Sequence, residues 1–393
     1  MKLLVILSRI PYPLKKGDKL RAYHQIRCLS KYHKITLIAL TDKKIHPQAK
    51  IQLSQFCQEV YFLKLNKLGI FLNIIKAFFN GLPLQVGYFY NKKIRKNINS
   101  IIHELKPEHI YCQLIRTAEY ARHLDIPKTI DFQDTFSIGM KRRYEKSNSL
   151  FKPFLYLEYK RLVKYERTAF ELFDSHTLIS YPDRDFFPHP SKNKIFIIKN
   201  GVDFKYFTSE SRIKKYEVIF TGNMAYPPNI DAATFLAAEI MPLVRKRFPQ
   251  AYLVLAGATP HLKVKRLSDN HTIVTGWVDD IRQWYDSSKV FIAPMRLGTG
   301  LQNKLLEAMA MHLPCITSSL ANEALHAIPN EEILIGNSAQ EYANHIIELL
   351  VNPVLYHKLS LNGHRFVTEN YSWEKATKKL DAILTNQFNK ELD

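Results

Sequence analysis

The sequence is poor in cysteine and has no long hydrophobic run. Only four cysteines occur among 393 residues, far apart along the chain. Their number excludes a dense disulfide scaffold of the secreted type, and their separation excludes a compact zinc site. No window reaches the roughly 20 apolar residues of a membrane-spanning helix. The apolar run at the start is interrupted early by Ser8 and Arg9, so we interpret it as a first strand and expect a cytoplasmic protein.

Acidic residues are in short supply as well. The 36 Asp and Glu residues face 56 Lys and Arg residues, which leaves a net charge of +20. Such a charge favours anionic partners, among them phosphorylated ligands, anionic membrane surfaces and nucleic acids. The basic residues are spread along the chain, without zinc-finger spacing or an aromatic RNA-binding motif, so no nucleic-acid partner is expected. No metal site or bound cofactor is expected either.

One apolar segment, residues 68–79, is flanked by lysines. Asn73, Lys76 and Asn80 recur at helical spacing and would form a narrow polar stripe on a broad apolar face. A helix of this kind suits the surface of an anionic membrane, so peripheral attachment to the inner membrane face is one interpretation. A helix packed into the core or between domains is the other.

Strand-like apolar runs alternate with amphipathic segments throughout, which is the pattern of parallel sheets covered by helices. We therefore expect an α/β protein with two doubly wound domains at 1–200 and 217–370, a linker at 201–216, and a C-terminal helix at 371–393 that returns to the first domain. The expected strands are Lys2–Leu7, Lys34–Leu40, His109–Cys112, Lys128–Asp131, Thr177–Ser180, Val218–Thr221, Ala251–Ala256, Thr272–Thr275, Val290–Ala293 and Cys315–Thr317. The expected helices include Lys19–Lys31, Asp231–Arg247 and a long or broken helix over Ser137–Phe173.

A glycine-containing turn joins a strand to a helix at residues 296–300, Arg-Leu-Gly-Thr-Gly. Gly298 and Gly300 let backbone N–H groups approach a ligand closely, and a helix that begins near Leu301 presents unpaired donors at its start. Open parallel sheets bind ligands beyond the carboxyl ends of their strands. The segment therefore predicts a phosphate site.

Two charged residues follow in this helix. Lys304 lies in the first turn, where the helix dipole disfavours a cation unless an anion neutralises it. Glu307 lies three residues further on and shares the same face of the helix. A diphosphate would supply the anion, and a carboxylate beyond it can accept the hydroxyls of a ribose. The alternative is a solvent-facing Lys304–Glu307 pair on an ordinary helix.

An ordered set of motifs surrounds this segment. The motifs are Lys199-Asn-Gly-Val-Asp203, Phe220-Thr-Gly222, Ile240-Met-Pro242, Leu253-Val-Leu-Ala-Gly257, Gly276-Trp-Val278-Asp279, the run Leu306–Pro314, and Tyr371-Ser-Trp373, together with Pro11-Tyr-Pro13, Gly17 and Arg21 near the start. This set resembles glycosyltransferases of the two-Rossmann GT-B architecture, in particular glycosyltransferase family four, the glycosyl transferases group 1. The match spans most of the chain and is dense from about 195 to 320.

The resemblance implies two Rossmann-like domains that face a cleft, with the donor in the second domain and the acceptor on the first. It implies that Lys304 contacts the donor diphosphate, that Glu307 contacts the ribose, and that Arg296 adds positive charge for catalysis. The other donor-binding positions that it implies are Gly222, Asn223, Gly276, Val278, Gly298, Thr299 and Gly300. On the acceptor side the candidates are Gly17, Arg21, Gln113, Asp131 and Asp134.

The sequence also departs from the family pattern. Thr299 stands where many members keep a carboxylate that contacts the transferred sugar. Asn223 and Asn229 lie where the family has an arginine and a lysine, and Gln113 stands in place of a histidine. The departures leave the sugar and the catalytic base open.

The expected reaction moves a sugar from a UDP- or GDP-sugar to an acceptor hydroxyl with retention of configuration, as in retaining hexosyltransferases. The acceptor would be a glycan or a lipid-linked molecule, in the synthesis of cell-surface polysaccharide or lipopolysaccharide. Two alternatives stay open: a catalytically silent binding or scaffold protein, which Thr299 and Gln113 support, and a sugar-nucleotide epimerase. The epimerase would need an acidic and histidine cluster that is not evident.

Overall fold

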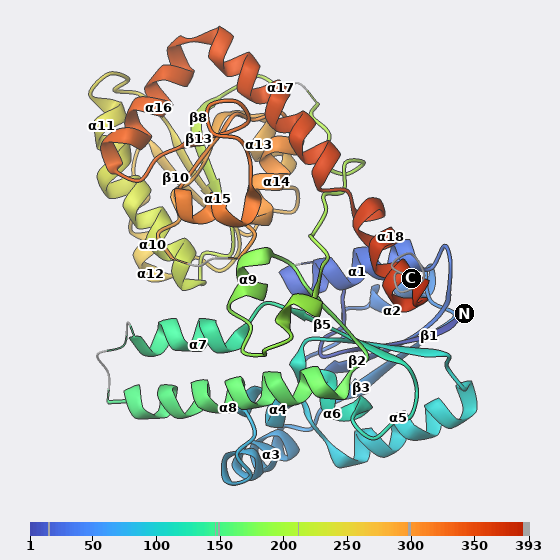
Figure 1. Cartoon of the computed structure of the whole chain (residues 1–393). Helices are drawn as coiled ribbons and strands as arrows, with labels where there is room; N and C mark the ends of the chain where they lie inside the picture. The colour runs from blue at the N-terminus through green and yellow to red at the C-terminus, as the bar shows by residue number, and fades with distance from the viewer. Residues whose placement is uncertain (15, 146, 148–149, 211, 298–299, 388–393) are drawn as a thin grey trace. The chain divides into compact units, whose positions relative to one another are not determined.

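A computed structural model gives the structure of the chain. The chain divides into two compact units (Figure 1). The first unit contains Met1–Lys199 together with the segment from Trp373 onward, and the second contains Asn200–Ser372. The residues that the structure describes are 1–14, 16–145, 147, 150–210, 212–297 and 300–387.

The first unit is built on a seven-stranded parallel sheet in the order β3-β2-β1-β4-β5-β6-β7. Its strands are β1 (Lys2–Leu7), β2 (Lys34–Thr41), β3 (Glu59–Lys64), β4 (His109–Gln113), β5 (Lys128–Gln133), β6 (Ser175–Leu178) and β7 (Phe196–Ile197). Its helices are α1 (Gly17–Leu29), α2 (Ala49–Ser54), α3 (Lys67–Phe79), α4 (Leu84–Phe89), α5 (Lys92–Leu105), α6 (Ala118–Ala121), α7 (Phe136–Glu145), α8 (Lys152–Leu172), α9 (Tyr181–Asp185) and α18 (Trp373–Leu384), with short 3-10 turns η1 (Ile115–Thr117) and η2 (Lys192–Lys194).

Successive side chains of β1 point to opposite faces of this sheet, as the period of a strand requires. Leu3 and Val5 join a core with Ile26 of α1 and Leu380 of α18. Leu4 and Ile6 belong to the core on the other face, which contains Ile94, Ile98 and Ile102 of α5. A strand that is apolar on both faces therefore lies in the middle of a sheet with helices on both sides.

The C-terminal helix α18 packs on α1 of the first unit. The ring of Trp373 stacks on that of His24 with centroids 5.0 Å apart, and His33 Nε2 lies 2.6 Å from Asp381 Oδ1. Trp373 is almost completely buried. The segment that precedes this helix instead belongs to the second unit, where the amide of Val202 donates to the carbonyl of Tyr371.

The second unit contains a six-stranded parallel sheet in the order β10-β9-β8-β11-β12-β13. Its strands are β8 (Tyr216–Thr221), β9 (Leu253–Ala256), β10 (Thr272–Gly276), β11 (Ser288–Ala293), β12 (Cys315–Thr317) and β13 (Leu334–Ile335). Its helices are α10 (Pro227–Phe235), the π-helical turn η3 (Leu236–Ile240), α11 (Met241–Arg245), α12 (Leu262–Lys265), α13 (Arg282–Asp286), α14 (Asn303–Ala310), α15 (Ser319–Leu325), α16 (Ala339–Val351) and α17 (Pro353–Asn370).

The expected strands are all present, most with ends shifted by one to two residues, and three further strands were not expected. β7 and β13 have only two residues each, and β3 is a half-exposed edge strand. The long or broken helix expected at Ser137–Phe173 is broken into two helices, α7 and α8. The helix expected at Asp231–Arg247 begins earlier, at Pro227, and is interrupted by η3. Residues 201–216, expected as a linker, pack on the second unit, because the Ser209 hydroxyl donates to Asp286.

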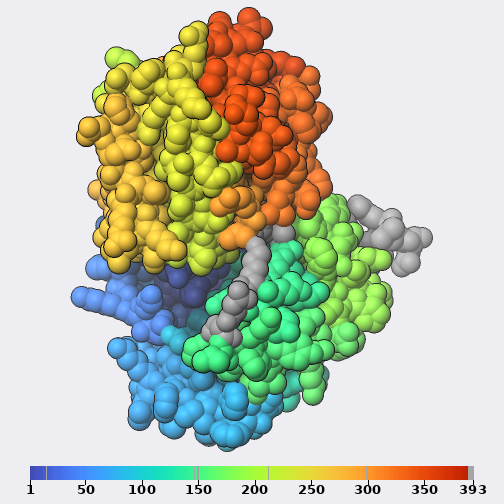
Figure 2. All heavy atoms as spheres, turned by 90° about the vertical axis from the view of Figure 1, so that its left-hand side faces the viewer, coloured from blue at the N-terminus to red at the C-terminus, as the bar shows by residue number. Residues whose placement is uncertain are grey.

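The lysine-flanked segment is a surface helix of the first unit, α3. It buries only Ile70 and Ala77, so the core-packed interpretation is wrong for this helix within the first unit. In the space-filling view the light-blue part of the chain that includes α3 lies on the outside of the unit (Figure 2). Across the described residues, none of the helices has both the length and the apolar character needed to cross a bilayer.

Candidate functional site

The second sheet has a switch point between β8 and β11. From β8 the chain proceeds to β9 and β10 on one side, and it then returns to place β11 on the other side of β8. The loops that leave the carboxyl ends of β8 and β11 therefore turn in opposite directions, and open α/β sheets bind their ligands beside such a point. The loop after β11 leads into α14, which carries Lys304 and Glu307.

Lys304 lies in the first turn of α14, with its ammonium group directed at Asn229. Its Nζ donates to Asn229 Oδ1 at 2.6 Å and lies 4.8 Å from the centroid of the Phe220 ring. Burial lowers the pKa of Lys304 to about 7, a shift that the charge of Glu307 opposes. Among the described residues, no carboxylate lies within 4 Å of this Nζ. A phosphate beside it would restore the stability of its charged form.

Glu307 is held by a buried chain of hydroxyl groups. The Tyr285 hydroxyl donates to Glu307 Oε2 at 3.0 Å and lies 2.7 Å from Thr221 Oγ1. Tyr285 is completely buried, which fixes the position of the carboxylate. Burial raises the pKa of Glu307 to about 7, against the stabilising bond from Tyr285 and the charge of Lys304. The second oxygen, Oε1, has no hydrogen-bond donor in the described part of the chain.

The two charged residues are thus separate groups with their own partners. Neither Lys304 nor Glu307 is fully exposed, and no ion pair joins them. The alternative of a solvent-facing pair is therefore wrong. Within the described residues, the arrangement combines a cation that has no ion-pair partner with a carboxylate whose second oxygen is free to accept a hydrogen bond, one turn apart on α14.

Glycines allow three neighbouring strands to end close together at this edge. Gly222 follows β8 with φ +151°, and Gly257 follows β9 with φ +144°. A Cβ added to Gly257 would lie 1.9 Å from the carbonyl oxygen of Gly222, so a side chain cannot fit there. The amide of Gly257 donates to the carbonyl of Gly276, the last residue of β10, at 3.1 Å. Gly222 and Gly276, both expected in the donor site, therefore belong to the same edge of the sheet.

Asn229 is the site residue whose role the sequence did not reveal. Its Nδ2 donates to the carbonyl of Asn223 at 2.9 Å, while its Oδ1 accepts from Lys304. Asn223 in turn accepts from the Thr259 hydroxyl at 2.8 Å, which ties the loop after β8 to the loop after β9. The sequence implied Asn223 as a donor-binding position but marked Asn229 only as a position without the expected positive charge. In the structure Asn229 positions the positive charge of Lys304.

Arg296 is engaged elsewhere in the unit. Its Nη2 and Nε donate to the two carboxylate oxygens of Asp231 at 2.9 and 3.1 Å, and its guanidinium lies 4.2 Å from the centroid of the Phe235 ring. This bidentate pair would have to open before Arg296 could contact a ligand. The catalytic role of Arg296 stays a prediction.

The remaining donor-site candidates have fewer contacts that fix their positions. Val278 is half-buried, and the Gly300 carbonyl accepts from the side-chain amide of Gln302 at 2.9 Å. The helix begins at Asn303, two residues later than expected. Gly298 and Thr299 lie outside the described residues.

The acceptor-side candidates of the first unit fall into two groups. Arg21 and Asp131 form an ion pair at 2.6 Å with both side chains closed to solvent, and the Thr177 hydroxyl donates to the same carboxylate at 2.8 Å. Gln113 is buried as well. The exposed candidates are Gly17, the first residue of α1, and Asp134, which follows β5. Gly17 and Asp134 are accessible to an acceptor in this arrangement. Arg21 and Asp131 are not, and their ion pair belongs to the interior of the unit.

One Asp-x-Asp sequence, the spacing of a common metal motif, occurs at 183–185 in the short helix α9. Ser180 caps this helix, and its hydroxyl donates to Asp183 Oδ2 at 2.5 Å. Positions two apart on a helix point to different sides, so Asp183 and Asp185 do not converge. The described residues contain no group of three or more His, Cys, Asp or Glu side chains that could hold a metal. Asp183 is the third residue of α9, and its amide and carboxylate both bond to the capping Ser180 hydroxyl.

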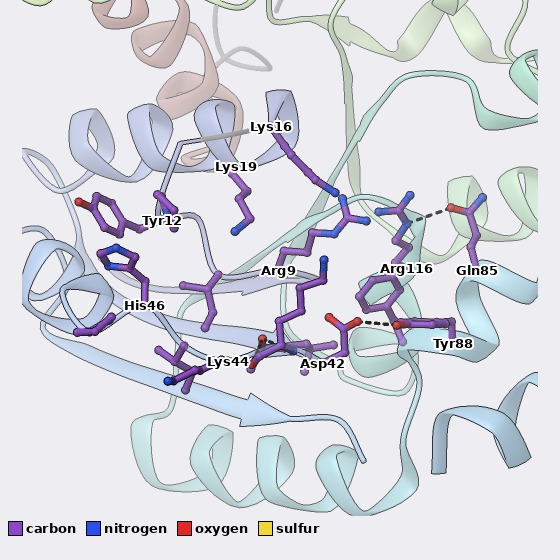
Figure 3. A pocket seen from close by; sticks show the side chains of 18 of the residues that line it. Arg9, Tyr12, Lys16, Lys19, Asp42, Lys44, His46, Gln85, Tyr88 and Arg116 are labelled. Carbon is purple, nitrogen blue, oxygen red and sulfur yellow. Dashed lines mark hydrogen bonds between the residues drawn. The ribbon is translucent and has the colours of Figure 1, made fainter. Parts of the chain in front are cut away.

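The sequence did not predict a pocket in the first unit. Its volume is about 800 Å³, and it lies beside the loops that follow β1, β2 and β4, with Arg9, Lys16, Lys19 and Arg116 along its wall (Figure 3). The only sequence signal was the general excess of basic residues, which does not show where they gather.

Comparisons with known proteins show a family match in the second unit and a common fold over the whole chain. Residues 215–352 match the family model of glycosyl transferases group 1. An uncharacterized 44.6 kDa protein in the cps region of Klebsiella pneumoniae is 24% identical over 396 residues, which cover 95% of this chain and 97% of that protein. Sucrose-phosphate synthase from Thermosynechococcus elongatus has a TM-score of 0.71 at 14% identity, with 99% of this chain and all 100% of that chain covered. HepE of Anabaena in complex with UDP has a TM-score of 0.70 at 15% identity, with 98% and 100% covered, and its complex with UDP-glucose scores 0.68.

These likenesses extend over both units. They confirm the expected α/β fold with two parallel sheets, each covered by helices.

Proposed function

We propose a function from the premise that this chain has the GT-B fold and carries a glycosyl transferases group 1 domain at residues 215–352. The chain transfers a sugar from a nucleotide-diphosphate sugar to an acceptor hydroxyl, with retention of anomeric configuration. The observation that carries this proposal is the placement of Lys304 and Glu307 on α14, beside the switch point of the second sheet.

In this proposal the donor diphosphate lies against the start of α14. Lys304 supplies the counter-charge, Asn229 holds its Nζ, and the start of α14 adds the positive end of the helix dipole. The Tyr285 hydroxyl orients Glu307, whose free oxygen accepts a ribose hydroxyl. A solved neighbour, HepE, binds UDP and UDP-glucose, which supports a UDP-sugar as the first donor to test. A GDP-sugar is the second.

Catalysis then depends mainly on stabilising the leaving group. As the bond between the sugar and the diphosphate breaks, negative charge grows on the β-phosphate, and a preorganised cation lowers the energy of that state. Lys304 is suited to this task because burial has already removed most of its water. Retaining hydrolases use two carboxylates that flank the sugar. Here Glu307 is assigned to the ribose, so the departing phosphate accepts the proton of the acceptor hydroxyl on the same face.

The relative in the cps region of Klebsiella pneumoniae supports a role in polysaccharide synthesis. A protein of that role receives a growing glycan or a lipid-linked sugar as its acceptor. We place this acceptor on the first unit, and the protein in the cytoplasm.

The surface helix α3 supports attachment to an anionic membrane. Its exposed apolar side chains include Phe71, which is 61% exposed, and Phe79, which is 80% exposed, and Lys67 and Lys76 lie on the same helix. An amphipathic helix with flanking lysines binds an interface through both apolar burial and charge. Replacing Phe78 and Phe79 by serine should release the protein from vesicles that contain anionic lipid. Wild-type protein that never sediments with such vesicles would contradict membrane attachment.

The proposed function is tested with purified protein and a panel of UDP- and GDP-sugars. Thermal shift identifies the donor, and calorimetry then compares wild type with Lys304→Ala and Glu307→Ala. Both variants should lose most of the donor affinity, while Lys246→Ala, at the end of α11, should keep it. Unchanged affinity in both variants would contradict the site. Binding without transfer or hydrolysis would identify a silent binding protein, and NMR of the product tests retention.

A further inference from the structure

The pocket of the first unit lies at the switch point of its own sheet. β1 is flanked by β2 on one side and by β4 on the other, so the loops after β1 and β4 diverge at the carboxyl edge. The pocket has a volume of about 800 Å³. Residues from these loops and from the loop after β2 line it, and Ile74 of α3 and Leu84 of α4 close one side.

The described lining is strongly basic. It contains six cationic side chains and one carboxylate, that of Asp42, which already accepts from the Tyr88 hydroxyl at 2.6 Å. The cationic residues are Arg9, Lys16, Lys19, Lys43, Lys44 and Arg116. In Figure 3 the side chains of Arg9, Lys16 and Arg116 converge on one region of the pocket.

Most of this charge has no counter-ion among the described residues of the unit. Arg9 pairs with Asp18 at 2.7 Å, but the ammonium groups of Lys16, Lys19 and Lys43 have no hydrogen-bond or ion-pair partner in the part of the chain that the structure describes. Arg116 donates through Nε to Gln85 at 3.0 Å, and its buried Nη1 has no partner there.

The helix α1 adds to this positive field. Lys16 is its N-cap residue and makes no side-chain capping bond, and Lys19 lies in the first turn. A helix N-terminus carries partial positive charge and normally attracts acidic side chains. The first turn also contains Asp18, which pairs with Arg9, so the two lysines leave an excess of positive charge at this helix end, beside a basic pocket, and indicate a site for an external anion.

The cations also destabilise one another. Burial lowers the pKa of Lys16 and of Lys19, and the neighbouring charges of Arg9 and Lys43 lower both further. Burial and then Arg9 lower the pKa of Arg116 to about 10. Binding a group with several negative charges would relieve this repulsion, which a neutral sugar cannot do.

We propose that this pocket binds the phosphate or diphosphate group of the acceptor, so that the acceptor is a phosphorylated glycan carrier. The inference rests on the proposed glycosyl transfer. Arg9, Lys16, Lys19, Lys43 and Arg116 contact the phosphate oxygens, and the apolar side chains Ile10, Leu40, Ile74, Leu84 and Phe89 contact the part of the carrier next to the phosphate.

The test measures binding of inorganic pyrophosphate and of farnesyl diphosphate to the full chain by calorimetry. Saturating UDP is present, so that the donor site of the second unit is already occupied. The test variant is Lys16→Gln/Lys19→Gln, and the control is Lys96→Gln, an exposed lysine of α5 that does not line the pocket. Circular dichroism melting shows that each variant is folded.

We expect the double variant to bind both probes at least about tenfold more weakly, because two charge-assisted contacts are lost. The control should bind as wild type does. Tighter binding of farnesyl diphosphate than of pyrophosphate would identify a prenyl-linked carrier, and equal binding would show that the pocket recognises the diphosphate without a prenyl chain. Equal affinity of wild type and double variant, or no binding of either probe, overturns the inference. If UDP binds but the diphosphates do not, the donor assignment stands and this inference alone fails.

Discussion

Raising the pH above 7 should weaken UDP binding through one side chain, Lys304. Burial lowers the pKa of this ammonium group to about 7 in the unliganded site, and a diphosphate within hydrogen-bond distance would favour its charged form. Binding therefore takes up a proton wherever free Lys304 is neutral, which is the range above pH 7. Affinity should fall roughly fivefold from pH 7 to 8, and nearly tenfold more from pH 8 to 9.

Below pH 7 the affinity for UDP depends on other groups as well, so the measurement is confined to pH 7 and above. Burial raises the pKa of Glu307 to about 7, and a protonated Glu307 accepts ribose hydroxyls poorly, so affinity should fall below pH 7 as well. The terminal phosphate of UDP itself titrates near pH 6, at about the pKa of other phosphate monoesters. Only the alkaline side therefore reports on Lys304.

The assay is isothermal titration calorimetry at pH 7, 8 and 9, in two buffers with different ionisation enthalpies. The buffer difference should show uptake of nearly one proton per UDP at pH 8 and above. Lys304→Met should lower affinity at pH 7 by about 10- to 150-fold, the loss of a charge-assisted contact of 1.5–3 kcal/mol, and it should remove the alkaline slope. Lys246→Met removes an exposed charge of the same unit and should keep both affinity and slope.

A flat wild-type affinity between pH 7 and 9 would refute this reasoning, because it would mean that the protonation of Lys304 is not linked to the diphosphate. So would a Lys304→Met variant that keeps the slope.

Three further predictions concern the residues that support the two units. Tyr285→Phe removes the hydroxyl that positions Glu307 and should weaken UDP binding by about 1–2 kcal/mol in calorimetry, whereas unchanged affinity would show that Glu307 does not need it. Gly257→Ala places a Cβ 1.9 Å from the Gly222 carbonyl oxygen and should lower the free energy of unfolding by about 2 kcal/mol or more in urea denaturation. The control Gly139→Ala, whose Cβ would meet nothing within 4 Å, should raise the free energy of unfolding by up to about 1 kcal/mol. Arg21→Met leaves the buried Asp131 unpaired and should destabilise the first unit by about 3–5 kcal/mol, while Arg21→Met/Asp131→Leu should recover most of that loss; equal melting of both variants would contradict a buried ion pair.

The strands were predictable where a local pattern sufficed. β1 and β12 have the predicted ends, because each is a continuous apolar run bounded by polar or turn residues. β7 and β13 were not predicted, since two residues carry no periodicity and are strands only because a neighbouring strand pairs with them. The π-helical turn in the helix before β9 likewise has no signal in the hydrophobic pattern.

The candidate site shows the same division. Lys304 and Glu307 were predicted from their position after a glycine turn, which is a local property of α14. Their partners were not, because Asn229 lies 75 positions from Lys304 and Tyr285 lies 22 positions from Glu307. The basic pocket of the first unit was not predicted for a related reason. Its lysines and arginines lie in the segments that follow three different strands, and these segments come together only because the strands are parallel neighbours in one sheet.

The sequence by itself determined the period of most of the longer strands and helices, the glycine turn before α14 and the unusual lysine in its first turn, since these depend on neighbours a few residues apart. Only the tertiary structure decided how those charges behave. Burial beside Phe220 and Asn229, not the sequence around it, lowers the pKa of Lys304 to about 7. Burial also turned Arg21 and Asp131, two candidates for the acceptor site, into an interior ion pair. Desolvation depends on every atom packed around a group, and those atoms come from distant parts of the chain.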